Sequence, residues 1–171
     1  GTSHKPKLFV KGIELKQSRL PDLLKTTMKT VLLSILKGEN GEKTTDWLVS
    51  TVDRIVSGQV SPDEVCIRGK LEKDLSKYKV LGEARAGAAW ANENLGKGYR
   101  AGSFFNVTLD ENGKYIAFDD ASEIEGFAQI GYFHIASRFV VEKVRNYFQI
   151  AGWDFNPVEN ALHGKSKIDW F

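Results

Sequence analysis

Residues 132–152, YFHIASRFVVEKVRNYFQIAG, carry the strongest helical pattern in this sequence. Apolar side chains recur there at the spacing of one helical face, at Phe133, Ala136, Val140, Val144, Tyr147 and Phe148. Gly152 follows directly, and glycine just past a periodic segment is a common helix stop. The pattern predicts a helix over 132–151, against which the rest of the chain packs.

Two more helices are expected near the start of the sequence. In residues 20–36 the apolar side chains follow one helical face, and Pro21 suits a first helical turn because its missing N–H costs nothing there. A second helix is expected at about 45–57, with a threonine cap in front and Gly58 behind. The glycine-containing segment KGENGEK separates them, which predicts an antiparallel helical hairpin.

The middle of the chain mixes short elements. We expect a brief buried strand at VCI (65–67), one or two helical turns at LEKDLSKY (71–78), and a helix over 83–95. One face of that helix carries only small residues, Ala84, Gly87, Ala88 and Ala91, which lets another backbone approach closely. SFFNVTL and KYIAF flank the turn DENG and predict a β-hairpin. With a further turn at NPVENAL, the fold class is α+β: mainly helical, with a small antiparallel β-hairpin.

Composition bounds the class of protein. The chain has 171 residues, 42% of them hydrophobic, which is enough for a real core. No apolar run reaches the roughly 18 residues that span a bilayer, and no signal peptide opens the chain, so we expect no membrane partner and a cytoplasmic location. Cys66 is the single cysteine, which excludes an internal disulfide and a cysteine-cluster metal site.

The sequence lacks recognisable catalytic motifs. It has three histidines, no glycine elbow around a serine, and no phosphate-binding glycine loop. We therefore predict no catalytic residue, no metal site and no cofactor in this chain. The acidic group Asp119, Asp120, Glu123 and Glu125 could hold a divalent cation through oxygen ligands, although a solvated acidic turn explains it as well.

The net charge of +2 hides an uneven distribution. Residues 4–29 are rich in Lys and Arg, whereas residues 110–125 are acidic, so a basic and an acidic side are expected. The basic residues of the first segment are Lys5, Lys7, Lys11, Lys16, Arg19, Lys25 and Lys29. A second group, Arg85, Lys97 and Arg100 with Tyr99, brackets the small-residue helix. Two such groups favour a groove for a phosphate backbone, the alternative being an ordinary solvated surface.

The chain closes on KSKIDWF, which leaves three bulky apolar side chains, Ile168, Trp170 and Phe171, in the last four residues. Such a tail either docks on its own core or binds a partner. Gly164 and two lysines separate it from the preceding helix, and closely spaced anchors suit one hydrophobic pocket. The arrangement favours a partner.

Several of these segments together resemble a known family. KPKLFVKGIELKQSRLPDLLKTTMKTVLLSIL (5–36) resembles the junction of palm and thumb in family B DNA polymerases, particularly the replicative enzymes of T-even-like phages, with Gly12, Ser18 and Pro21 at the matching places. ARAGAAWANENL is similar to the family's Arg-Gly segment, SFFNVTLDENGKYIAF to its hairpin, and FHIASRFVVEKVRNYFQIAGWDF to its closing helix. The tail KSKIDWF resembles the peptide by which such polymerases bind a sliding clamp.

The resemblance implies a division of the chain and a set of partners. Residues 1–19 would end the junction, with 1–3 an artificial leader, 20–163 would form a thumb-like domain, and 164–171 the clamp-binding tail. The implied partners are primer-template double-stranded DNA, held independently of sequence, a sliding clamp, and the palm and exonuclease domains of a full viral polymerase in its host's cytoplasm. The implied DNA contacts are Lys11, Lys16, Ser18, Arg19, Lys25, Lys29, Arg85, Tyr99 and Arg100. The implied clamp contacts are Ile168, Trp170 and Phe171.

The sequence also departs from that pattern. The paired aspartates that hold Mg²⁺ in the family's palm have no counterpart here, so nucleotidyltransferase activity is not expected of this chain alone. Arg19 stands where a small polar residue is expected. Two other hypotheses stay open: an adaptor that acts only through its hydrophobic tail, and a small metal-dependent hydrolase using Asp119, Asp120 and His134.

Overall fold

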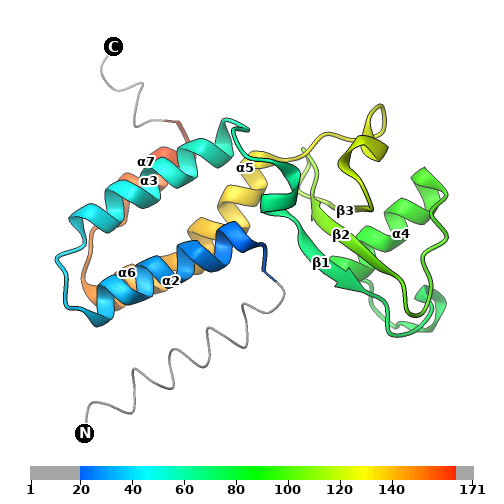
Figure 1. Ribbon diagram of the computed structural model, residues 1–171, viewed down its shortest axis with the longest axis horizontal. Coiled ribbons are helices and arrows are strands. Elements are labelled where there is room, and N and C mark those ends of the chain that lie inside the picture. The colour runs from blue at the N-terminus through cyan, green and yellow to red at the C-terminus, as the bar shows by residue number, and fades with distance from the viewer. Residues whose placement is uncertain (1–19, 165–171) are drawn as a thin grey trace, which may run out of the picture.

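A computed structural model describes residues 20–164, which form a helical half and a sheet half (Figure 1). The helical half comprises residues 20–60 and 131–164, and the sheet half residues 61–130. The helices of the helical half are α2 (Asp22–Leu36), α3 (Glu42–Val56), α5 (Tyr132–Ile135), α6 (Glu142–Ala151) and α7 (Asn156–Leu162). The sheet half holds β1 (Ile67–Lys70), β2 (Phe104–Leu109), β3 (Tyr115–Phe118) and α4 (Glu83–Leu95). The predicted class, mainly helical α+β with a small antiparallel sheet, is confirmed.

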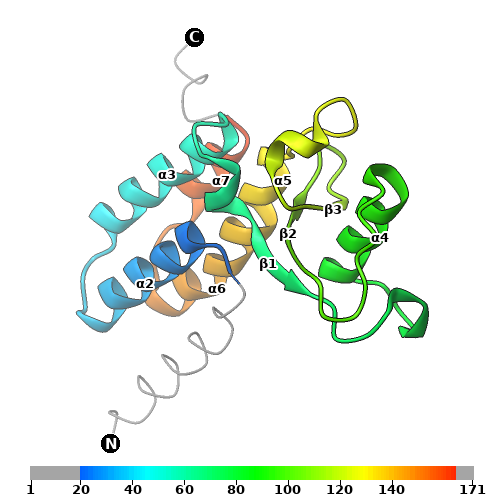
Figure 2. The ribbon, with the colours of Figure 1, turned by 45° about the vertical axis from the view of Figure 1, so that its right-hand side comes forward.

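The helical half is built around one apolar cluster. The helices α2 and α3 run in opposite directions (Figures 1 and 2), α6 packs along α2, and α7 packs along α3. Leu24, Leu48, Ile55 and Phe148 are fully buried in the cluster, each from a position that the helical spacing marked as apolar. Burying a side chain of this size contributes about 1.5–3 kcal/mol, so packing of these faces supplies most of the helices' stability.

The long helix over 132–151 is present but not uniform. Between α5 and α6 the segment Ala136–Val141 forms a π-helical turn. Phe139, Val140 and Val141 are all buried, although three consecutive residues point in different directions in a regular α-helix. The wider turn occurs where the helix is enclosed on several sides, a local adjustment that the apolar spacing did not predict.

The start of α3 differs from the prediction. Gly41, rather than a threonine, precedes the first residue of the helix, and the Asn40 side chain accepts the N–H of Glu42 through Oδ1 at 3.1 Å. Gly41 has a φ of 87°, and a Cβ there would lie 2.4 Å from the Trp153 ring, so the turn and the ring both require glycine. Thr44 lies inside the helix and donates a hydrogen bond to Ser34 Oγ at 2.6 Å.

The sheet has three antiparallel strands in the order β1-β2-β3. The predicted hairpin is confirmed as β2 and β3, which pair Asn106 with Phe118 and Leu109 with Tyr115. The predicted strand at 65–67 is shifted, because Pro62–Val65 forms a 3-10 turn with a capping box and β1 begins only at Ile67. Of the predicted turns at 71–78, only Leu75–Lys77 is helical.

The small-residue face of α4 lies across the sheet, as its composition predicted. Gly87, Ala88 and Ala91 are buried there. A Cβ on Gly87 would come within 3.2 Å of the backbone carbonyl of Ile116 in β3. The helix therefore packs closer to the sheet backbone than larger residues would allow.

The two halves share buried contacts. Tyr115 and Ile130 pack against cores on both sides of the junction. The Arg138 guanidinium, in the π-helical turn, donates to the carbonyl of Gly113 in the hairpin turn at 2.8 Å. Within residues 20–164 no helix combines the length and the apolar character needed to cross a bilayer.

Candidate nucleic-acid interface

The predicted binding residues fall into two sets. Lys11, Lys16, Ser18 and Arg19, and the tail residues Ile168, Trp170 and Phe171, lie outside the described residues. Lys25, Lys29, Arg85, Tyr99 and Arg100 lie within them. The geometry of this second set, and of the cations around it, defines the candidate site.

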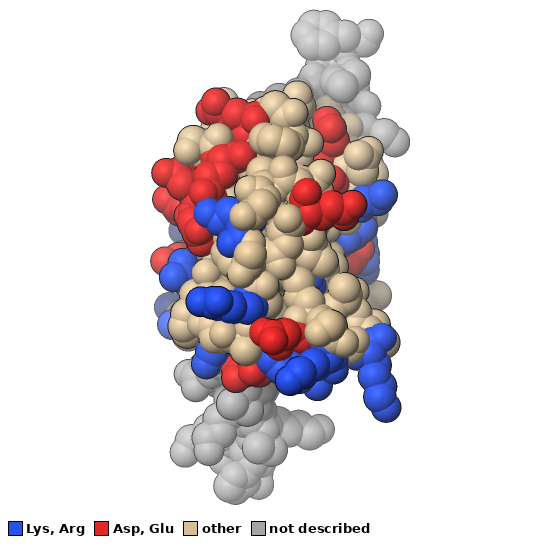
Figure 3. Space-filling model, turned by 90° about the vertical axis from the view of Figure 1, so that its right-hand side faces the viewer, with Lys and Arg blue, Asp and Glu red and all other residues tan. Residues whose placement is uncertain are grey.

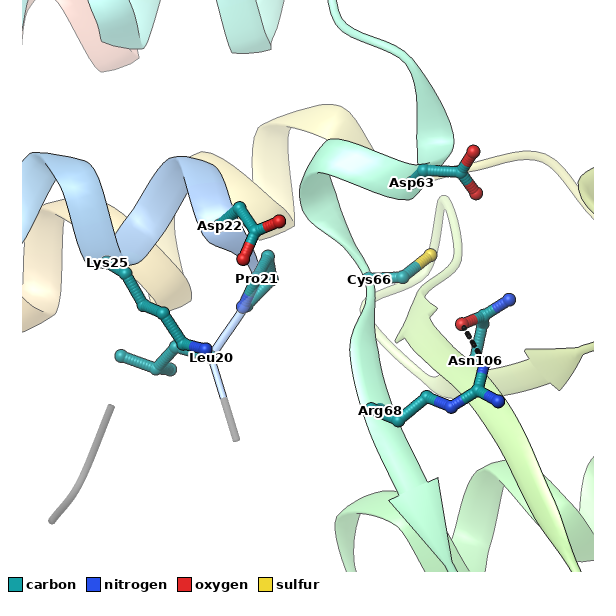
Figure 4. Close-up of a pocket in the computed structure, with 8 residues that line it drawn as sticks. All are labelled: Leu20, Pro21, Asp22, Lys25, Asp63, Cys66, Arg68 and Asn106. Atoms are coloured by element: carbon teal, nitrogen blue, oxygen red, sulfur yellow. Dashed lines mark hydrogen bonds between the residues drawn. The ribbon is translucent and has the colours of Figure 1, made fainter. Parts of the chain in front are cut away.

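A cleft of about 220 Å³ lies between the start of α2 and the sheet (Figure 4). Lys25 lines it from α2, and Arg68 faces it from β1. Lys29 is one helical turn beyond Lys25 and is exposed. The Arg68 guanidinium donates to Asn106 Oδ1 at 3.3 Å, which holds it at the cleft's edge. The remaining lining residues are Leu20, Pro21, Asp22, Asp63 and Cys66.

The strand β1 extends the positive charge away from the cleft. Arg68 and Lys70 are exposed, while Gly69 between them is buried, so the alternation of the strand places both cations on one face. Lys70 Nζ lies 5.3 Å from the centre of the Phe104 ring and 3.6 Å from Glu72. No role was assigned to these residues from sequence, although the alternation of Arg68 and Lys70 around a small residue was the available signal.

The segment 71–78 brings Arg85 and Arg100 to the same end of the sheet half. Arg85 lies over the Tyr78 ring, 4.0 Å from its centre. The loop at Arg100 is held to the segment by two backbone groups, Ala101 N–H donating to Asp74 Oδ1 at 2.8 Å and Gly102 N–H to the Leu71 carbonyl at 2.7 Å. Two arginines far apart in sequence therefore flank one segment.

Together these cations form what we call the basic strip. It runs from α2 across β1 to the 71–85 region, and in Figure 3 Lys and Arg gather toward the lower part of the sheet half. Its members are Lys25, Lys29, Arg68, Lys70, Lys73, Lys77, Lys79, Arg85 and Arg100. Of these nine cations only Lys70 has an acidic partner within ion-pair distance among the described residues. The other cations are therefore available to an anionic ligand.

Lys97 belongs to the opposite, acidic end of this half, where Figure 3 shows Asp and Glu gathered toward the top. Its ammonium lies 2.6 Å from Asp119 and 2.6 Å from Glu123. Hydrogen bonds to these two carboxylates raise the pKa of Lys97, and the hydrogen bond from Lys97 lowers the pKa of Glu123. Lys97 is thus neutralised by its neighbours and does not add to the basic strip.

Tyr99 is a structural residue in this arrangement. Its side chain is 8% exposed, stacks on Phe105 with ring centres 4.7 Å apart, and donates its hydroxyl to Asp119 at 3.1 Å. Burial, with a further contribution from Asp119, raises the pKa of the Tyr99 hydroxyl. The DNA contact expected of Tyr99 therefore has no exposed ring to make it, and the residue supports the loop that carries Arg100 instead.

The residues of the hydrolase hypothesis do not converge. Asp120 caps the 3-10 turn Ala121–Ile124, Asp119 pairs with Lys97, and His134 lies against Gly113 at the far end of the hairpin. Within residues 20–164 no three His, Cys, Asp or Glu side chains are grouped so as to hold a metal ion. Cys66 is buried, and burial raises the pKa of its thiol to about 12, so it stays protonated at neutral pH.

Comparison with known proteins gives two partial relationships, while no family model matches the sequence. The chain is 33% identical over 96 residues to a DNA polymerase of Archaeoglobus fulgidus, a match covering 56% of this chain and 12% of that protein. It is 30% identical over 76 residues to a DNA polymerase of Thermococcus aggregans, covering 44% of this chain and 4% of that protein. The matches thus involve only a small part of either relative's length. The chain that carries the basic strip is therefore distantly and partially related to archaeal DNA polymerases.

Proposed function

We propose that this chain is the thumb region of a family B DNA polymerase and that it holds double-stranded DNA through the basic strip. The observation that carries the proposal is that Lys25 of α2 and Arg68 of β1 line one cleft and that the 71–85 region carries further exposed cations, in a chain related to DNA polymerases. A DNA polymerase moves along the duplex it makes, so such a grip has to be independent of base sequence. Contacts with phosphates meet that requirement.

Each part of the strip has a distinct role in this proposal. Lys25 and Lys29 lie one turn apart on α2 and reach one phosphate backbone. Arg68, fixed by Asn106, and Lys70 continue the contact along β1. Arg85 and Arg100 hold the far end, because Arg85 in the first turn of α4 lies over the Tyr78 ring and the loop of Arg100 is bonded to Asp74. In the full polymerase Mg²⁺ belongs to the palm, outside this chain.

The two terminal segments complete the proposal. Lys11, Lys16, Ser18 and Arg19 precede Leu20, which lines the cleft, and they extend the contact with DNA from the palm side. Ile168, Trp170 and Phe171 anchor the polymerase to a sliding clamp. The grip and the anchor then act together, since a tethered thumb rebinds the duplex at a high effective concentration.

Salt-dependent binding of duplex DNA tests the grip. Fluorescence anisotropy with a labelled 20-base-pair duplex should give an affinity that falls about a hundredfold between 50 and 200 mM NaCl if roughly four phosphates are contacted. Lys25→Glu with Lys29→Glu, and Arg85→Glu with Arg100→Glu, should each weaken binding by more than about tenfold. The matched control, Arg54→Glu with Lys114→Glu, reverses two exposed cations outside the strip and should have a much smaller effect.

The same titration separates this proposal from the adaptor hypothesis. Deleting residues 168–171 should abolish binding to a sliding clamp and leave the DNA affinity within about twofold. If the full chain shows no affinity for duplex DNA at 50 mM NaCl, or if the strip and control variants behave alike, the proposed grip is wrong.

A further inference from the structure

Two exposed apolar side chains, Val80 and Leu81, lie among the cations of the basic strip. Val80 is 73% exposed and Leu81 is 43% exposed, in the short loop that leads into α4. Val80 has the largest exposed fraction among the large hydrophobic side chains that the structure describes. Cations flank the pair on both sides, Lys77 and Lys79 before it and Arg85 after it, and all three are exposed.

The loop holds its shape although its tip is exposed. Tyr78 anchors its base, because the hydroxyl accepts the backbone N–H of Glu72 at 3.0 Å and of Lys73 at 3.2 Å. Lys73 and Arg85 each lie over the Tyr78 ring, at 4.9 and 4.0 Å from its centre. At the other end Glu83 has a φ of 48°, an uncommon value for a residue other than glycine, and the chain enters α4 there. The loop that carries Val80 and Leu81 is therefore held at one end by the Tyr78 hydrogen bonds and at the other by α4.

We propose that Val80 and Leu81 form an apolar contact with the minor groove of double-stranded DNA, between phosphates held by Lys77, Lys79 and Arg85. This inference rests on the proposed function and adds a non-ionic contact to it. Complementarity of charge selects the occupant: unpaired cations on both sides of an apolar tip match a groove whose walls carry phosphates and whose lining includes apolar sugar edges. Other minor-groove binders also place apolar side chains in the groove, where leucine and isoleucine are among those inserted between base steps.

The contact predicts a distinct dependence on salt. Release of counterions sets the slope of log affinity against log salt concentration, whereas apolar contacts contribute an amount that remains at high salt. Removing Val80 and Leu81 should therefore lower the affinity by the same factor at each salt concentration. Removing lysines should instead make the slope shallower.

Three variants of the full chain test this with the labelled duplex. Val80→Ser with Leu81→Ser should weaken binding about tenfold at every salt concentration, with the slope unchanged. Lys77→Gln with Lys79→Gln should make the slope of log affinity against log salt concentration shallower, by an amount that corresponds to about two phosphate contacts. Ile150→Ser, the matched control, removes a side chain of α6 that is 71% exposed and lies outside the basic strip, and should leave both quantities unchanged.

Two further measurements locate the contact. Netropsin bound in the minor groove of an A·T-rich duplex should weaken the wild type but have little further effect on Val80→Ser with Leu81→Ser. If that variant binds bare duplex as the wild type does, or if netropsin weakens both equally, the groove contact is wrong while the phosphate grip stands.

Binding to phosphatidylserine vesicles that requires Val80 and Leu81, with no effect of the pair on duplex affinity, would assign the tip to a membrane surface instead. Absence of duplex binding by the wild type at low salt would overturn the proposed function and this contact with it.

Discussion

The helical half and the sheet half reach stability by different means. In the helical half one continuous cluster of buried side chains joins α2, α3, α6 and α7. The sheet half has two smaller clusters, one under α4 and one around Ile116 and Phe118. It compensates with polar links, including the Lys97 ion pairs and the bonds from Asp74 and Tyr78 to loop backbones.

This difference explains where the candidate interface lies. A small core leaves a large part of the sheet half at the surface, and its loops are fixed by hydrogen bonds that do not need apolar cover. Most cations of the basic strip stand on those fixed loops and on the edge strand β1. The helical half supplies the stable base and contributes only Lys25 and Lys29.

The largest expected effect is the loss of the helical core. Phe148 is fully buried and its ring contacts Trp153 and Phe155, with ring centres 5.3 and 5.0 Å away. Phe148→Ala should lower the free energy of unfolding by about 3–5 kcal/mol, because it removes the apolar contacts and leaves a cavity. Urea denaturation followed by circular dichroism measures the change. Ile150→Ala, two residues away and 71% exposed, should stay within about 0.5 kcal/mol; similar losses for both would contradict the assigned core.

The sheet half should be most sensitive where α4 meets β3. Gly87→Val would place a branched side chain where a Cβ is already within 3.2 Å of the Ile116 carbonyl, so we expect a loss of about 1–3 kcal/mol from overpacking. Ala86→Val introduces the same side chain at a half-exposed position of the same helix and serves as the control, although replacing alanine by valine lowers the helix propensity whereas replacing glycine by valine raises it. Equal unfolding free energies for the two variants would show that the close approach of α4 is not required.

The polar links should matter less and depend on pH. Glu123 has a lowered pKa in the folded chain because Lys97 donates to it, so its contribution to stability is present above its unfolded pKa, about 4.5, and is lost as the pH falls through the lower folded value. Glu123→Gln should cost about 1 kcal/mol at pH 7. The stability difference between wild type and variant should shrink below pH 4.5, as measured by thermal unfolding from pH 7 to pH 3. A constant difference across this range would exclude the ion pair as its cause.

The smallest effect is expected for the exposed ion pair of the helical half. Arg145 donates to Glu159 Oε1 at 2.6 Å, but the two side chains are 42% and 34% exposed, so water and salt screen the pair. Arg145→Met keeps most of the apolar stem and should lower stability by no more than about 0.5 kcal/mol. Unfolding in 1 M NaCl should remove that difference. A loss larger than that of Glu123→Gln would reverse the contrast between the two halves.

Much of the fold followed from local patterns. The apolar spacing predicted α2 and the long helix to within a few residues, the segment EARAGAAWANENL with its small-residue face predicted α4, and Asn112 with Gly113 predicted the hairpin. Two local predictions were wrong, the position of the strand β1 and the cap of α3. The strand β1 has only four residues and no apolar alternation of its own, and it exists because β2 offers it a pairing edge. The threonine cap was wrong because Asn40 and Gly41 already begin the helix at Glu42, where the Trp153 ring leaves no room for a Cβ on residue 41.

The candidate site was predicted less completely. The sequence by itself determined the cations, the apolar periodicities and the glycines, since these depend on residue type and local spacing. Only the tertiary structure decided that Arg68 and Lys70 join the cleft to the Arg85 end, that Lys97 is neutralised by carboxylates, and that Tyr99 is buried. The reason is physical: the availability of a charge or a ring depends on which distant groups surround it, and local spacing carries no information about those neighbours.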